Sequence, residues 1–431
     1  MCKITLGMLT VVLIVVGCKS VDVPYKSNLT ERKLQVDLTG GKKVMAYFPE
    51  WGGIEGGYTV WDVPAEHLTH LFYAFAHLTE DGQVKVDMLS KGLEMVYPEG
   101  KGVQGVKGHL RQLIELKKKY PHLKTLISIG GWELSMHFSS LSVTAYGRET
   151  LAKNAVAFMH KYQFDGIDID WEFPVKGSKY KDKQRPEDRE NFTKLMQAIR
   201  DEMDFYEEED DKEYLLTAAV TVSIYRQKHL ELQKLSKLFD FVNVMVYDMH
   251  GRWIKDQTGH LSPMYPTKAI AGDENICGDI GLQGYLNAGF KPGQIMVGAP
   301  LYAAGWQGVD VKKEGVFQKA VGLAKGTSVH KGYYEWRYIA KELLEKQGNQ
   351  YYLKMDEDAK AAYVWAPEVD GGTWITCPSR ASYQAKIDYV KQYDLGGMFF
   401  WDVSNDVRDP ESVQSLIRFT ADGLMHSKSY K

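Results

Sequence analysis

The chain has 431 residues and a formal net charge of −3 at pH 7. It is long enough for one large domain or a few average ones, and so small a charge gives no electrostatic attraction to nucleic acid. Its 26 tyrosines, 16 phenylalanines and 10 tryptophans can fill a core and favour neutral, bulky ligands. No CxxC or His-rich pattern indicates a structural metal, and we predict no cofactor.

The first residues predict an exported protein. An apolar run over residues 4–16 follows one lysine and is too short to span a bilayer, which is typical of a signal peptide. The segment VVGC at its end resembles a bacterial lipobox, so we expect residues 1–18 to be a lipoprotein signal peptide with Cys18 lipidated. A simple secretory signal or an uncleaved anchor is the alternative. Polar residues 19–41 predict a tether to the outer membrane or cell surface of a bacterial envelope.

Eight short β-rich runs alternate with amphipathic helices from residue 42 onward. The helical spacing of apolar residues predicts helices over 109–120, 148–162 and 188–203, and the acidic residues 207–213 predict a solvated loop. This alternation predicts an α/β fold, a (β/α)8 TIM barrel. The predicted strands are residues 42–48, 67–76, 123–131, 164–173, 214–223, 241–249, 294–302 and 395–403.

About ninety residues separate the seventh run from the eighth, which is more than a βα unit needs. They contain a predicted helix over 333–347 and predicted strands over 361–368 and 373–377. We therefore predict a small α+β insertion over 305–390, with the barrel formed by 42–304 and 391–424. Cys277 and Cys377 lie outside the signal peptide, and the sequence does not say whether they pair.

Four carboxylates lie in the fourth run, FDGIDIDWEFP, residues 164–174. Side chains alternate between the two faces of a strand, so Asp168, Asp170 and Glu172 share one face and the isoleucines share the other. Buried like charges raise one another's pKa, which prepares a general acid at the carboxyl end of a barrel strand. Asp165 is predicted to be structural. A magnesium site and an acidic surface loop are the alternatives.

This segment resembles the DxxDxDxE signature of glycoside hydrolase family 18, the family of chitinases. Four further segments resemble the family's strand motifs in the same order: SIGGW at 128–132, NVMVYDMHG at 243–251, VGAPLY at 297–302 and GGMFFWDVSND at 396–406. The resemblance extends over about residues 42–420. It implies a monomeric chitinase that hydrolyses β-1,4 linkages in chitin or N-acetylglucosamine oligomers, without a metal or nucleic acid.

The resemblance also implies roles for single residues. Glu172 corresponds to the general acid and base, and the substrate's own 2-acetamido group acts as the nucleophile with retention of configuration. Asp170 would orient the acetamide N–H, Asp168 would share a proton with it, and Tyr247 would donate to the acetamide oxygen. The implied substrate-binding residues are Trp401, Asp248, Met245, Trp132, Tyr47, Phe75 and Tyr302.

One departure concerns the seventh strand, where the family commonly has Tyr-Gly-Arg and this chain has Tyr302-Ala303-Ala304. The missing arginine puts one sugar contact in doubt. Three other functions remain as alternatives: an endo-β-N-acetylglucosaminidase acting on the chitobiose core of N-glycans, a chitin-binding lectin, and a metal-dependent hydrolase. The sequence does not distinguish endo from exo cleavage.

Overall fold

The computed structural model describes residues 41–52, 57–86, 91–267, 276–327 and 330–425, which belong to one compact unit. The predicted signal peptide, Cys18 and the tether up to residue 40 lie outside the described residues. Within the described ranges, no helix has both the length and the apolar character that crossing a membrane requires.

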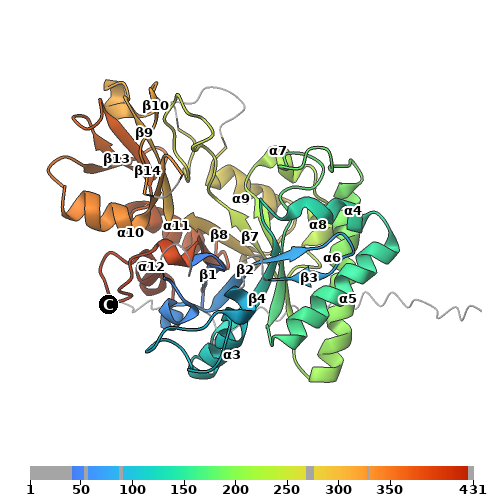
Figure 1. Cartoon of the computed structure of the whole chain (residues 1–431). Helices are drawn as coiled ribbons and strands as arrows, with labels where there is room; N and C mark the ends of the chain where they lie inside the picture. Colours follow the sequence, from blue (N-terminus) through green and yellow to red (C-terminus); the bar gives the residue numbers. More distant parts are fainter. Residues whose placement is uncertain (1–40, 53–56, 87–90, 268–275, 328–329, 426–431) are drawn as a thin grey trace, which may run out of the picture. The chain divides into compact units, whose positions relative to one another are not determined.

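Eight parallel strands close into a barrel, and Figure 1 shows them at its centre. The strand order is β1-β15-β8-β7-β6-β5-β4-β2, and β1 pairs with β2 to complete the ring. The predicted (β/α)8 barrel is therefore confirmed. The bounds are β1 Lys43–Pro49, β2 His70–Leu78, β4 Lys124–Gly130, β5 Gly166–Asp170, β6 Leu215–Thr221, β7 Phe241–Met245, β8 Ile295–Pro300 and β15 Gly397–Trp401. A short strand β3, Val84–Lys85, pairs antiparallel with the end of β2.

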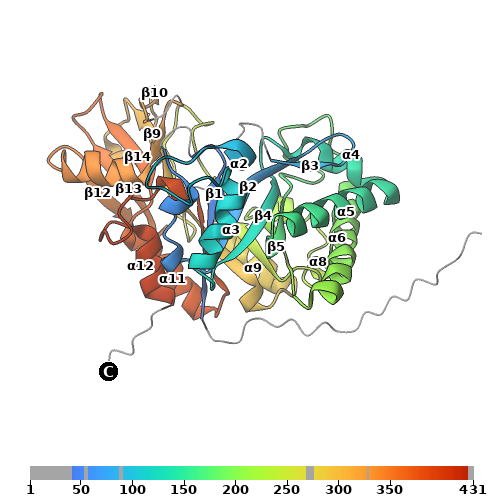
Figure 2. The same ribbon diagram turned by 60° about the horizontal axis from the view of Figure 1, so that its bottom comes forward.

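Helices surround the strands, as Figure 2 shows for α3, α5, α6, α11 and α12. Three of them match the helices predicted from apolar spacing, α3, α5 and α6. The bounds are α2 Lys91–Glu94, α3 His109–Lys119, α4 Phe138–Ser142, α5 Ala145–Lys161, α6 Asp188–Asp210, α7 Ile224–Gln227, α8 Leu232–Leu235, α9 Gly278–Asn287, α11 Arg380–Gln392 and α12 Leu416–Leu424.

The loop predicted over 207–213 is wrong in its first half, because α6 continues to Asp210. Arg200 is buried and its Nη2 lies 2.6 Å from Glu207 Oε1, while its Nε lies 2.6 Å from Asp204 Oδ1. The carboxylate of Glu207 also accepts from the backbone N–H of Tyr214 at 2.7 Å. These contacts neutralise part of the acidic stretch, so its repulsion does not end the helix.

The strand β5 shows the predicted alternation. Ile167 and Ile169 are fully buried in the apolar cluster that also contains Leu195 and Ile199 of α6. Asp168 points the other way, into the barrel, where hydroxyl groups from neighbouring strands contact it. The outer face of β5 therefore packs on helices, and the inner face is free for chemistry.

The second sheet lies in the segment between β8 and β15, at the upper left of Figure 1. Its order is β10-β9-β14-β13-β12, with β11 paired to β9. The predicted boundaries at 305 and 390 stay a prediction; α11 itself contacts the barrel strands β8 and β15. The bounds are β9 Tyr302–Gln307, β10 Gly322–Leu323, β11 Tyr333–Glu335, α10 Trp336–Tyr338 continuing as a π-helix over Ile339–Glu345, β12 Tyr352–Asp356, β13 Ala361–Ala366 and β14 Thr373–Cys377.

Candidate active site

Asp168 is fully buried at the centre of the barrel and is held by donors from other strands. Its carboxylate accepts hydrogen bonds from Tyr47 Oη of β1 at 2.9 Å, Ser128 Oγ of β4 at 2.7 Å and Thr217 Oγ1 of β6 at 2.6 Å. Asn243 Nδ2 of β7 donates to Tyr47 Oη at 2.9 Å. Burial raises the pKa of Asp168, and the three hydroxyl bonds oppose that rise.

Asp170 lies one strand repeat closer to the carboxyl end of β5 and is also buried. Within the described residues, its Oδ1 has no hydrogen-bond partner. Burial raises its pKa well above the ordinary value, and the nearby charges of Glu172 and Asp168 raise it further. A buried carboxylate with an unfilled acceptor position is costly, so this oxygen is prepared to accept a donor from outside the chain.

Glu172 follows the strand and is partly exposed at the mouth of the barrel. Its backbone N–H donates to Ser135 Oγ at 2.9 Å. Its pKa is raised to about 8, first by burial and then by the charge of Asp248, while Arg226 and the backbone N–H of Trp132 lower it. Glu172 therefore carries a proton at neutral pH, as a general acid requires.

The two glycines after β4 bring this strand end close to its neighbours. Gly130 has φ +114° and Gly131 has φ +89°, a backbone region that favours glycine. A Cβ on Gly130 would lie 2.2 Å from the backbone oxygen of Asp170, and one on Gly131 would lie 2.7 Å from the ring of Phe75. The two glycines of SIGGW are therefore required for steric reasons, because any larger residue would collide with the backbone of β5 or with the ring of Phe75.

Aromatic side chains form a wall beside the carboxylates. The rings of Trp401 and Phe75 stack with centroids 5.4 Å apart and an interplanar angle of 21°. The ring centroids of Tyr47 and Trp51 lie 5.6 Å and 6.1 Å, respectively, from the ring centroid of Trp401. Trp401 is partly exposed, whereas Tyr47 is buried beneath it. A ring held in this way offers a flat apolar face to the C–H groups of a sugar.

A second group of predicted residues follows β7. Tyr247 is buried, and its ring packs edge-on against Tyr302 at 6.3 Å. Burial raises the pKa of Tyr247 well above its ordinary value, and Asp170 and Asp248 add to the rise, so the hydroxyl stays a donor. Asp248 is exposed, and its Oδ1 accepts from Tyr302 Oη at 2.6 Å. Met245 is half-buried against the aromatic cluster inside the barrel.

The other residues singled out from the sequence lie in different parts of the structure. The side chain of Trp132 is 44% exposed, so a ligand can reach its ring. Asp165 lies at the opposite end of β5, where it pairs with Lys117 at 2.6 Å and Lys212 at 3.1 Å, which agrees with a structural role. Cys277 and Cys377 are both free and buried.

Sequence reasoning missed several residues that support this site. Asn243 and Thr217 lie on the inner face of the barrel beside Asp168; the isolated asparagine within the apolar run FVNVM was the available signal. Arg226 follows β6 and acts on Glu172, and no motif indicated it. Ala304, at the position of the missing arginine, is buried and pairs with Tyr333 of β11.

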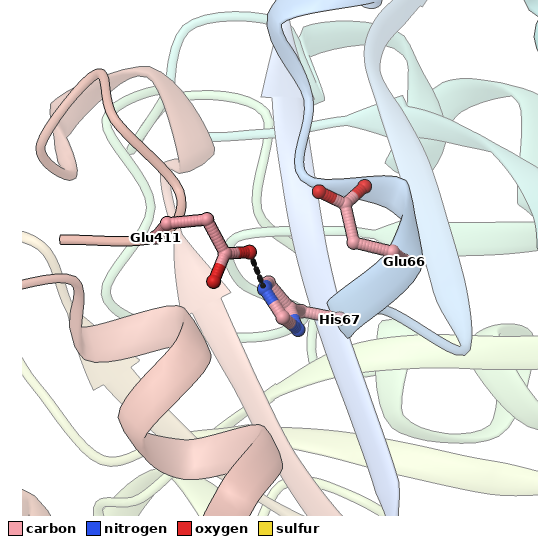
Figure 3. A group of neighbouring side chains, drawn as sticks. All are labelled: Glu66, His67 and Glu411. Carbon is pink, nitrogen blue, oxygen red and sulfur yellow. Dashed lines mark ion pairs between the residues drawn. The ribbon is translucent and has the colours of Figure 1, made fainter.

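The described residues contain one group with side chains suited to a cation: Glu66, His67 and Glu411 (Figure 3). His67 precedes β2, at the end of the barrel opposite to Glu172. Its Nε2 lies 3.4 Å from Glu411 Oε1, and both carboxylates are exposed.

Comparisons with known proteins give one family. The model of the glycosyl hydrolases family 18 matches residues 43–406. The chain is 32% identical over 399 residues to chitinase A1 of Niallia circulans, with 84% of this chain and 56% of that protein covered. It is 30% identical to chitinase 1 of Aphanocladium album, with 86% and 83% covered. Chitinase ChiA74 from Bacillus thuringiensis has a similar structure, with a TM-score of 0.82, 29% identity, and 90% and 70% of the two chains covered.

Proposed function

The chain belongs to the glycosyl hydrolases of family 18, and from this premise we propose that it is a chitinase. It hydrolyses β-1,4 linkages between N-acetylglucosamine units of chitin or its oligomers, by a retaining mechanism in which the substrate's acetamido group is the nucleophile. The relatives named above are chitinases, and the resemblance of the motifs carries the mechanism to the corresponding residues of this chain.

The free Oδ1 of Asp170 is the observation that supports this mechanism most directly. An acetamide N–H is a neutral donor that would fill this acceptor position. Asp168 below it is already saturated with donors from three strands, so Asp170 is the carboxylate left for the substrate. The raised pKa of both residues means that they need not be ionised together, and one proton can be shared between them.

The proposed reaction has the following steps. The sugar to be cleaved lies on the ring of Trp401, and the Tyr247 hydroxyl and Asp170 hold its acetamide so that the carbonyl oxygen faces C1. Glu172 gives its proton to the glycosidic oxygen, the C1–O bond breaks, and the acetamide oxygen bonds to C1. The Glu172 carboxylate next takes a proton from water, which attacks C1 and restores the acetamide.

The test compares the wild type with Glu172→Gln on N-acetylglucosamine oligomers and on an N-glycopeptide, with product anomers followed by NMR. We expect cleavage of the oligomers to β-anomeric products, no effect of EDTA, and loss of turnover in Glu172→Gln. Glu149→Gln changes an exposed carboxylate on α5 and serves as the control, with wild-type turnover. Release of glycan from the glycopeptide alone indicates the N-glycan activity, and binding of oligomers without turnover indicates a lectin.

We also propose that Cys18 carries a lipid that anchors the enzyme to a bacterial envelope. The segment VVGC supports this proposal. Metabolic labelling with an alkyne fatty acid should mark the wild type and not Cys18→Ser. Labelling of both, or of neither, contradicts the proposal.

A further inference from the structure

Strand β11 of the inserted sheet brings an aromatic ring to the group of residues that follows β7. The ring of Tyr333 stacks on that of Tyr302, with centroids 5.8 Å apart and an interplanar angle of 12°. Tyr302 in turn donates to Asp248 Oδ1 at 2.6 Å, and its ring packs edge-on against Tyr247 at 6.3 Å. A single ring therefore separates Tyr333 from Asp248 and Tyr247.

The register of the two strands explains why the rings of Tyr333 and Tyr302 meet. β11 runs antiparallel to β9, with Tyr333 opposite Ala304 and Glu335 opposite Tyr302. The two tyrosines are thus diagonal neighbours across the strand pair, a separation that aromatic side chains bridge. Ala304 stands where the family motif has an arginine, and it presents only a methyl group to Tyr333. The small residue leaves the Tyr333 ring room to lean along the sheet onto Tyr302.

The position of the Tyr333 ring is also fixed by residues of the barrel. Its hydroxyl accepts from Asn405 Nδ2 at 2.9 Å, and the same amide donates to the buried carboxylate of Asp402 at 3.0 Å. The guanidinium of Arg252 lies over the ring, with its Cζ 5.4 Å from the ring centroid. Asp402 and Asn405 follow β15, and Arg252 follows β7. Two loops of the barrel therefore hold a ring that the insertion supplies.

We propose that Tyr333 is a positioning residue: its ring holds Tyr302 in the orientation in which the hydroxyl reaches Asp248. Both tyrosines are half-buried. Without the stack, the Tyr302 side chain would be free to change its rotamer, and the bond to Asp248 would be made for only part of the time. This role rests on the proposed chitinase activity, because Asp248 and Tyr302 are assigned to substrate binding by the family resemblance.

The pKa of Asp248 gives this role a measurable signature. Burial raises that pKa, and the Tyr302 hydroxyl from β9 and the Arg252 guanidinium from the same loop oppose the rise. Burial also raises the pKa of Glu172, at the end of β5, and of Tyr247, and the charge of Asp248 adds to both. Loss of the bond from Tyr302 should therefore raise the pKa of Asp248 further.

The first part of the test needs no substrate. Carbon-13 NMR of labelled aspartate carboxylates, with the signal assigned by Asp248→Asn, gives the pKa of Asp248 in each variant. Tyr302→Phe and Tyr333→Leu should each raise it by about one pH unit. Tyr333→Leu should add nothing further in the Tyr302→Phe background. A further rise in that background means that the effect runs through Arg252, and it overturns the proposal.

Activity on N-acetylglucosamine oligomers is the second part. Tyr333→Leu should lower kcat/KM about fivefold, which is within the range of an aromatic pair. In the Tyr302→Phe background the same change should cost less than about twofold. Tyr333→Phe keeps the ring, so its kcat/KM should stay within about twofold of the wild type and its Asp248 pKa should be unchanged. This variant keeps the proposal testable if Tyr333→Leu fails to fold.

Tyr334→Leu is the matched control. Tyr334 is the next residue of β11 and points to the other face of the sheet; it is buried, and its ring packs against Tyr338 at 6.2 Å. The variant removes an equal ring from the same strand, and it should leave the pKa of Asp248 unchanged even where it lowers Tm.

Three outcomes overturn the proposal: an Asp248 pKa that Tyr333→Leu leaves unchanged, an equal rise in Tyr334→Leu, or a loss of activity in Tyr333→Phe as large as in Tyr333→Leu. Failure of the wild type to cleave acetylated oligomers overturns the proposed function instead, and the NMR titration then decides alone whether Tyr333 positions Tyr302.

Discussion

The hydroxyl of Thr217 gives a direct measure of how firmly the central carboxylate is held. Thr217→Val replaces the hydroxyl by a methyl group of the same shape, and it removes the 2.6 Å bond to Asp168 Oδ1 in a fully buried place. A hydrogen bond to a charged group contributes about 1.5–3 kcal/mol, so we expect the free energy of unfolding at pH 7 to fall by about 2 kcal/mol. A domain of this size unfolds with an entropy of about 0.8 kcal/mol/K, so Tm should fall by about 2–3 °C.

The free energy of unfolding that Thr217→Val loses should depend on pH, and the direction of this dependence follows from the pKa of Asp168. Burial raises this pKa above the unfolded value, and the bond from Thr217 lowers it, so the variant raises it further. A carboxyl whose folded pKa is raised contributes stability below its unfolded pKa and loses that contribution as pH rises through the folded pKa. The difference between the wild type and Thr217→Val should therefore be smaller at pH 4 than at pH 7.

Urea unfolding at the two pH values measures this difference, and Thr420→Val is the control. Thr420 is equally buried, but its Oγ1 donates to a neutral acceptor, the backbone oxygen of Leu416, at 2.8 Å. Its loss should be about 1 kcal/mol and the same at both pH values. If Thr217→Val costs no more than Thr420→Val at pH 7, the bond to Asp168 is not a charge-assisted one.

Three further outcomes are expected. The pH profile of kcat/KM should fall above about pH 8 as Glu172 loses its proton, and Asp248→Asn should move that fall to lower pH because the charge of Asp248 raises the pKa of Glu172; an unmoved profile contradicts this coupling. Tyr302→Phe removes the 2.6 Å bond to Asp248 and should lower kcat/KM on oligomers about tenfold with little change in Tm. Burial lowers the pKa of Lys386 to about 7, so wild-type stability should rise from pH 7 to 10. Lys386→Met should be about 4 kcal/mol more stable at pH 7 and lose most of this advantage by pH 10; parallel stability curves contradict the reasoning.

The barrel could be predicted because its strands are buried on both faces and read as apolar runs separated by amphipathic helices. The C-terminal end of α6 could not be predicted, because Arg200 lies on the same helix and its ion pairs with Asp204 and Glu207 offset the repulsion among the acidic residues. The residues 333–335 were expected to be helical but pair with β9 as β11, a tertiary contact that local spacing does not reveal.

The candidate site also contains residues that could be predicted from the sequence and residues that could not. Asp168, Asp170 and Glu172 follow one another at period two on a single strand, so their common face could be predicted. Ser128, Thr217 and Asn243 come from three other strands, and only barrel closure brings them to Asp168. Arg226 belongs to a four-residue helix without a pattern of its own, and its relation to Glu172 exists only in three dimensions.

The pairing of β1 with β15 has a consequence for biosynthesis. Tyr47 comes from the first strand of the barrel, and Trp401 comes from the last; β1 is seated between β15 and β2. A nascent chain that has not yet been completed to Trp401 lacks the ring that stacks on Phe75 and leaves one edge of β1 open. We therefore expect the proposed chitinase activity to appear only when nearly the whole polypeptide has left the ribosome, and a chain truncated before residue 397 should be inert.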